Sequence, residues 1–195
     1  GSAPFKSDNA LVRAAGVVQR LAEYRPPPQF HELWRQQVDI LDVDDETKSI
    51  MLDESKIEDW LDAHPVEGLA RHFYSCTHTT FSPNVVESDR RMKTNVIPDQ
   101  IDVNVDIRTL PGESGAEVQA HLDAALGDLA DQVDVEIIMN DPASISRIDN
   151  PMWDTIQKAV NQPFPSARLV PQLIVGFTDA RVYRNLGSIA YGAGL

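Results

Sequence analysis

The strict alternation of apolar and polar side chains over residues 101–108 constrains the fold more than any other feature of this chain. If residues 101–108 form an extended strand, their apolar side chains point to one face and their polar side chains to the other. A strand with one buried face is typical of an antiparallel sheet that turns that face toward helices or a core. The sequence therefore predicts a sheet covered on one side.

Residues upstream of this strand predict a helix, a helical insertion and a second strand. Apolar residues recur at helical spacing over 9–24, and Pro26, Pro27 and Pro28 end that helix because proline lacks the amide hydrogen. The acidic stretch 25–72 is interpreted as an insertion of two or three short helices. Residues 73–81 are rich in aromatic and β-branched side chains, which favour a strand.

Residues downstream of the alternating strand predict a second helix and a further strand. Pro111-Gly112 indicates a turn, after which Ser114 and Glu117 form a capping box that begins a helix through about residue 130. The alternating pattern of 133–139 then indicates another strand.

This order of elements predicts an α+β fold over residues 1–142. Helix, two strands, helix and strand make most of a ferredoxin-like antiparallel sheet with two helices on one face. The first strand of that plan is missing, and we expect it before Gly1.

The chain after the linker-like stretch 141–150 follows a different pattern. Pro151 suits the first turn of a helix. Residues 168–175 indicate a strand with an irregular part at Pro171, and Thr178 or Asp179 is expected to cap a short helix.

Composition excludes several classes of partner. The formal net charge of −13 repels phosphate backbones and anionic lipid surfaces, so we expect neither nucleic acid nor membranes as partners. The only cysteine, Cys76, has no second thiol for an internal disulfide. A lone thiol is typical of a reducing compartment, which makes the cytoplasm the expected location.

Three groups of motifs, taken together, resemble the aminoacylase, carnosinase and desuccinylase family of zinc metallopeptidases, the twentieth metallopeptidase family. The similarity lies in their residue types, order and spacing. The motifs are Gly1-Ser2-Ala3-Pro4 with Asn9-Ala10; Asn95-Val96-Ile97-Pro98 with Asp106-Ile107-Arg108 and Pro111-Gly112; and Gly176-Phe177-Thr178-Asp179-Ala180-Arg181 with Gly187 and Tyr191-Gly192.

The resemblance implies a parent enzyme that hydrolyses the amide bond of an N-acyl-amino acid or a dipeptide. In this family a catalytic domain binds two zinc ions and uses a glutamate as general base, and a lid domain forms a homodimer. Residues 1–142 resemble the lid, whereas 143–195 resemble a partial α/β segment of the catalytic domain. The zinc-binding segments of the family have no counterpart here, so we expect the fragment to be inactive, with no catalytic or metal-ligating residue.

The resemblance also implies substrate-binding roles, each beside a simpler structural interpretation. Asn95 is either a turn residue or a donor in the neighbouring subunit's site. Arg108 either binds the substrate's carboxylate or pairs on the surface with Asp106 or Glu113. Thr178, Asp179 and Arg181 form a helix start that, by the same resemblance, also shapes the substrate pocket. These last three residues have the structural role in either case.

Histidines in this sequence do not form a predicted zinc site. His121 and Asp123 lie two positions apart on a helix and point about 200° from one another. On the predicted strand 73–81, Cys76 and His78 share a face with the preceding His72, but residues 72 and 76 are about 13 Å apart.

Two further hypotheses concern the chain as a whole. A stand-alone ferredoxin-like oligomerisation or binding module is the alternative to an enzyme fragment, and the upstream reading frame would distinguish the two. For the fragment, we expect the apolar residues of its last predicted strand to be exposed because their partner strands are missing. These residues are Leu169, Leu173, Ile174 and Val175.

Overall fold

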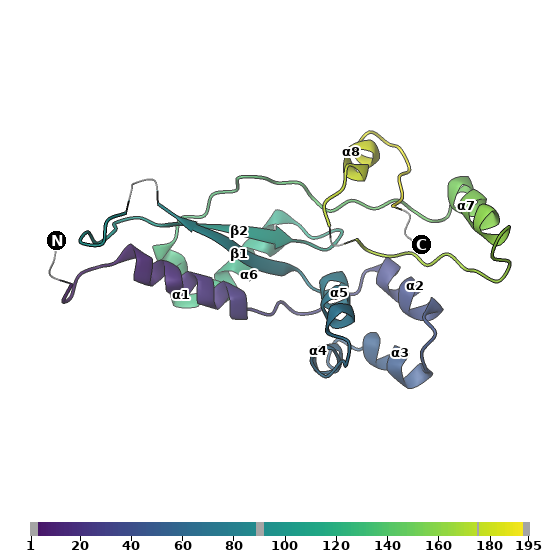
Figure 1. Cartoon of the computed structure of the whole chain (residues 1–195), viewed down its shortest axis with the longest axis horizontal. Coiled ribbons are helices and arrows are strands. Elements are labelled where there is room, and N and C mark those ends of the chain that lie inside the picture. Colours follow the sequence, from purple (N-terminus) through teal and green to yellow (C-terminus); the bar gives the residue numbers. More distant parts are fainter. Residues whose placement is uncertain (1–3, 89–91, 175, 193–195) are drawn as a thin grey trace. The chain divides into compact units, whose positions relative to one another are not determined.

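The computed structural model describes residues 4–88, 92–174 and 176–192, and the chain divides into two compact units. Unit 1 comprises Gly1–Pro26, Thr79–Thr109 and Ser114–Asn140. Unit 2 comprises Pro27–His78, Leu110–Glu113 and Asp141–Leu195. Figure 1 shows the elements of each unit.

Unit 1 contains an antiparallel pair of strands, β1 (Thr80–Glu87) and β2 (Asp102–Arg108). Phe81 lies opposite Ile107, and the register shifts between Pro83 and Val85. The alternating pattern therefore does form a strand, as predicted.

Two helices, α1 (Ala10–Glu23) and α6 (Gly115–Leu126), cover one face of this sheet (Figure 1). Their buried side chains contact Phe81, Val105 and Ile107 of the strands. The helix residues in this core are Val17, Leu21, Leu122 and Leu126. Burial of these side chains, at about 25 cal/mol per Å² of apolar surface, holds the helices on the sheet. The α+β class and the placement of both helices on one face are confirmed.

The ends of α6 follow local sequence chemistry. Ser114 and Glu117 form the predicted capping box, with the Ser114 amide donating to Glu117 Oε2 at 2.7 Å. The helix ends earlier than predicted, at Leu126, because Gly127 adopts a φ of 55°. A 3-10 helix, η1 (Gly127–Gln132), continues the chain.

The strand predicted over 133–139 is wrong for the described residues, whose sheet has only β1 and β2. Ile137, Ile138 and Met139 are 70%, 80% and 73% exposed. An isolated extended segment has no partner for its backbone hydrogen bonds, so an alternating pattern alone does not make a strand. The ferredoxin-like plan is thus only partly present.

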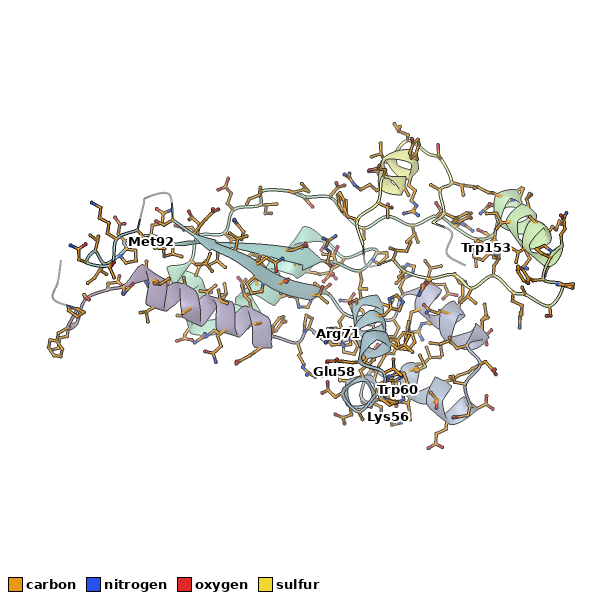
Figure 2. All side chains as sticks on the ribbon, in the orientation of Figure 1. Lys56, Glu58, Trp60, Arg71, Met92 and Trp153 are labelled. Carbon is orange, nitrogen blue, oxygen red and sulfur yellow. The ribbon has the colours of Figure 1, made fainter. Side chains whose placement is uncertain are left out.

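Four helices of unit 2 pack around one aromatic core: α2 (Glu32–Ile40), α3 (Asp45–Met51), α4 (Ile57–Asp62) and α5 (Glu67–Thr77). Trp34 is fully buried and its indole Nε1 donates to the Met51 carbonyl at 3.0 Å. Phe73 contacts Trp34 edge-on and stacks on Trp60, which Figure 2 labels on α4. The interpretation of this insertion as short helices is correct, but its described residues form four of them where two or three are predicted.

The strand predicted over 73–81 is wrong for most of its length. Its first part is the end of α5, and β1 begins only at Thr80. Phe73, Cys76 and Thr77 are the buried residues of α5, at the i, i+3 and i+4 spacing of one helical face. Packing of that face against the insertion core outweighs the local strand preference of the sequence.

The remaining part of unit 2 contains two helices, α7 (Pro151–Asn161) and α8 (Ala180–Asn185). Both agree with the predicted helices. The Asn150 side chain caps α7 by accepting from the Met152 and Trp153 amides at 3.0 and 3.2 Å.

The segment predicted as a strand over 168–175 is irregular in its described part, 168–174. Leu173 is buried in the core of α2–α5, which contradicts its expected exposure, whereas Ile174 is 57% exposed, as expected. Leu169 is half-buried, and Val175 lies outside the described residues. The helices of the insertion therefore bury Leu173, for which the expected partner strands are missing.

Candidate functional site

Asn95 lies in an exposed turn of the loop between β1 and β2 in unit 1. The Val96 amide donates to the Lys93 carbonyl at 3.0 Å, which closes the turn around Asn95. Met92, in the same loop, is labelled in Figure 2. The Ala10 amide donates to the Pro98 carbonyl at 3.2 Å, so the loop is attached to the start of α1.

Arg108 is the last residue of β2 and lies opposite Thr80. Its Nη2 is 2.7 Å from Asp106 Oδ2, and the two side chains are 43% and 42% exposed. The structural interpretation, pairing with Asp106, is therefore present in the structure. It leaves room for a substrate role because nearly half of the guanidinium side chain is still accessible.

These two residues lie toward opposite ends of unit 1. The Asn95 loop follows the end of the sheet where Glu87 pairs with Asp102, whereas Arg108 pairs with Thr80 at the other end. A strand of this length spans about 20 Å at ~3.3 Å per residue. A single copy of unit 1 does not bring the two side chains together around one small substrate.

Thr178 and Asp179 lie at the start of α8 in unit 2. Their carbonyls accept from the Arg181 and Val182 amides at 3.4 and 3.0 Å. Asp179 occupies the N-cap position, as one of the two residues predicted there, but its side chain makes no capping hydrogen bond to the helix. Both side chains are exposed and available to a ligand.

Arg181, one turn further along, is the most constrained of the predicted residues. Its Nη1 is 2.5 Å from Asp141 Oδ2, and its guanidinium carbon is 4.1 Å from the centre of the Phe177 ring. Its Nε is buried and has no hydrogen-bond partner among the described residues. The Nε–H belongs to the same guanidinium cation that pairs with Asp141.

Arg184, which the sequence interpretation missed, joins three segments of unit 2. Its guanidinium donates to the Ser144 and Ala190 carbonyls and to Ser146 Oγ. The signal available in the sequence was the i, i+3 spacing of Arg181 and Arg184, which places both on one side of a helix.

His72 and Cys76 are closer together than the predicted strand implied. They lie on α5, with Cys76 Sγ 3.6 Å from His72 Nε2. Burial raises the pKa of the Cys76 thiol to about 12, so the thiol is protonated at neutral pH and is a poor metal ligand. Among the described residues, no group of three or more His, Cys, Asp or Glu side chains is arranged to hold a metal ion.

The family assignment rests on a match to unit 1 and the insertion within it. Residues 1–134 match the family model M20_dimer, which describes the peptidase dimerisation domain. The chain belongs to the M20 peptidase family.

The chain is also similar to two known proteins. The chain is 30% identical over 96 residues to probable carboxypeptidase S-like 2 of Dictyostelium discoideum, covering 48% of this chain and 18% of that protein. Its fold is similar to the crystal structure of the M20 family metallo-carboxypeptidase Sso-CP2 from Sulfolobus solfataricus, with a TM-score of 0.56 and 14% identity. That similarity covers 95% of this chain and 44% of the solved chain. The chain thus spans less than half the length of either relative.

The M20 chain shows no membrane-spanning helix: within the described part, none is both long and apolar enough to cross a bilayer.

Proposed function

We propose that this chain is the dimerisation domain, with an adjoining catalytic-domain segment, of an M20 hydrolase that cleaves the amide bond of an N-acyl-amino acid or a dipeptide. The match of residues 1–134 to the peptidase dimerisation domain carries the proposal. The printed names of both relatives contain carboxypeptidase. A substrate with a free carboxylate fits that description and Arg108, to which the family resemblance gives a role in binding it.

The proposed substrate contacts come from three places, the start of α8 and the two ends of unit 1. Thr178 and Asp179 offer exposed polar side chains at the start of α8, and the Arg181 side chain is 30% exposed. Asn95 and Arg108 lie toward opposite ends of unit 1. In a homodimer, one of them can serve its own subunit's site and the other, Asn95, the partner's site. The separation within one copy supports this division.

Homodimerisation is proposed through the outer edge of β1 and the neighbouring surface of α1. Val85 and Val86 on β1 are 44% and 46% exposed, and Leu11 and Val12 on α1 are 42% and 68% exposed. Unpaired backbone groups at a strand edge pair readily across a two-fold axis, and the apolar side chains beside them gain from burial.

Two zinc ions are proposed for the parent enzyme, where they would supply Lewis-acid chemistry toward the amide bond if other parts of the parent bound them. The described residues do not fit a zinc centre, because they contain no suitable cluster and the Cys76 thiol is protonated. We propose that the metal ligands and the general base lie in other parts of the parent and that this chain alone is inactive. A cytoplasmic location stays a prediction from its single cysteine.

Light scattering of the purified chain, with and without zinc, tests this function. The expected result is a dimer of the 21.6-kDa chain whose mass does not depend on zinc. Val12→Lys should shift the population to monomer because it places a charge in the proposed interface. Ile138→Lys, at an 80% exposed position of the same unit, is the matched control and should leave the dimer intact. A monomeric wild-type chain, or assembly only with zinc, would contradict the proposal.

A further inference from the structure

Two arginines on one side of α8 hold the segment 141–147. Arg181 pairs with Asp141, at 2.5 Å between Nη1 and Oδ2. Arg184 donates from Nη1 to the Ser144 carbonyl at 3.1 Å and from Nε to Ser146 Oγ at 3.1 Å. The segment has no regular secondary structure, and these side-chain contacts connect it to the helix. At its end, the Arg147 carbonyl also accepts from Asn150 Nδ2 and from the Tyr191 hydroxyl.

The Arg184 guanidinium also holds the chain that follows α8. Arg184 Nη2 donates to the Ala190 carbonyl at 2.7 Å, and the Ala190 amide in turn donates to Ser146 Oγ at 3.0 Å. Ser146 is thus bonded to both Arg184 and Ala190. The ring of Tyr191 lies against Trp153 of α7, labelled in Figure 2, at 5.4 Å between ring centres, which extends the connection to that helix.

We propose that Arg184 is a positioning residue that, together with Arg181, straps residues 141–147 to α8 and holds the turn 176–181 in place. The planar guanidinium donates in several directions at once, which the single ammonium of lysine cannot reproduce. Any displacement of 141–147, the segment that follows the dimerisation domain in the chain, is thereby transmitted to Thr178 and Asp179. The consequence for substrate binding rests on the proposed function. The contacts of Arg181 and Arg184 with residues 141–147, called the strap below, do not.

Residue-resolved amide hydrogen exchange on the whole 195-residue chain tests the role of Arg184. The Ala190 amide is the reporter, because its acceptor is Ser146 Oγ. Both Ser146→Ala and Arg184→Lys should accelerate its exchange at least about tenfold, as expected from the loss of one or two hydrogen bonds. Arg168→Lys, an exposed arginine of the same unit, is the matched control.

General unfolding is separated from loss of the strap by the exchange of α7 amides. These should change less than about twofold in both variants, because α7 has its own Asn150 cap. Unchanged exchange at Ala190 in both variants would overturn the proposal, as would equal acceleration throughout α7.

A charge exchange tests the Arg181 half of the strap. Asp141→Arg or Arg181→Asp alone should increase the fast backbone motion of 141–147, measured by heteronuclear NOE, because each leaves two like charges side by side. The double variant should restore the wild-type values. Unchanged motion in the single variants, or no recovery in the double variant, would remove Arg181 from the strap.

These measurements require neither a dimer nor a substrate. A monomeric chain with a protected Ala190 amide would therefore contradict the proposed function and leave the strap intact. A dimer in which both substitutions leave the exchange of the Ala190 amide unchanged would support the proposed function and contradict the strap.

Discussion

At the scale of single residues, Gly127 shows how one backbone position ends a helix. It combines a φ of 55° with a ψ of −122°, a conformation that side chains with a Cβ rarely adopt. A Cβ there would lie 3.2 Å from Nη1 of Arg20. That arginine is held in place because it donates to the Leu126 carbonyl and pairs with Asp128 at 2.6 Å.

We expect Gly127→Ala to lower the free energy of unfolding by about 1–3 kcal/mol, the usual cost of a strained backbone position. Denaturant unfolding measures this. Gly115→Ala is the matched control, because Gly115 lies in the first turn of α6 and a Cβ there meets nothing within 4 Å. It should be neutral or stabilising. Equal effects of the two substitutions would show that backbone conformation is not the cause.

The capping box of α6 gives a pH dependence at the same scale. The backbone hydrogen bond from Ser114, and then its side-chain hydrogen bond, lower the pKa of Glu117 below its ordinary 4.5. A carboxyl group with a lowered folded pKa adds stability above its unfolded pKa and loses it as pH falls through the folded pKa. We therefore expect the stability difference between the wild type and Glu117→Gln to be constant near neutral pH and to shrink below about pH 4.5. Urea unfolding at a series of pH values checks this, and a difference that grows on acidification would contradict it.

At the scale of elements, the insertion depends on the packing of Trp34 of α2 against α3 and α5. Trp34→Phe removes the bond from Nε1 to the Met51 carbonyl and leaves unfilled space in a fully buried site. We expect a loss of about 2–3 kcal/mol in the free energy of unfolding. Trp60→Phe, at a half-buried position on α4, should cost less than about 1 kcal/mol. Similar losses in both variants would argue against a central role for Trp34.

The contact of α5 with the segment 168–174 makes a second prediction about elements. Cys76 is fully buried, with its Sγ 3.7 Å from the Leu173 carbonyl, and Leu173 packs in the same core. Leu173→Ala should therefore accelerate modification of Cys76 by an aromatic disulfide reagent, because it opens that cover. Ile174→Ala, at a 57% exposed position, should not. Equal labelling rates in all three proteins would mean that the segment does not protect the thiol.

At the scale of the whole molecule, charge opposes the proposed dimer. Each chain has a formal net charge of −13, so two copies repel one another at low ionic strength. Raising the salt concentration from about 10 to about 150 mM shortens the Debye length from ~30 to ~8 Å and should tighten the dimer. Sedimentation at several protein concentrations gives the dissociation constant at each salt level. A dimer that weakens with salt would indicate an interface held by ion pairs instead of apolar contacts.

The sequence by itself determined the elements whose causes are local. The alternation over 101–108 specified which side chains of β2 face the helices, Ser114 and Glu117 specified the start of α6, and Pro151 marked the start of α7. The family also followed from short motifs, because their order and spacing can be recognised in the sequence without knowing the fold.

Only the tertiary structure decided the elements whose causes lie far away in the chain. Residues 73–77 are helical because a core formed by Trp34 and its neighbours buries their helical face, whereas 133–139 have no described strand to pair with. The role of Arg184 could be recognised only in the structure, where its guanidinium bonds to Ser144, Ser146 and Ala190. Local pattern specifies which conformations a segment favours, but burial and hydrogen bonding between distant segments determine which of them is adopted.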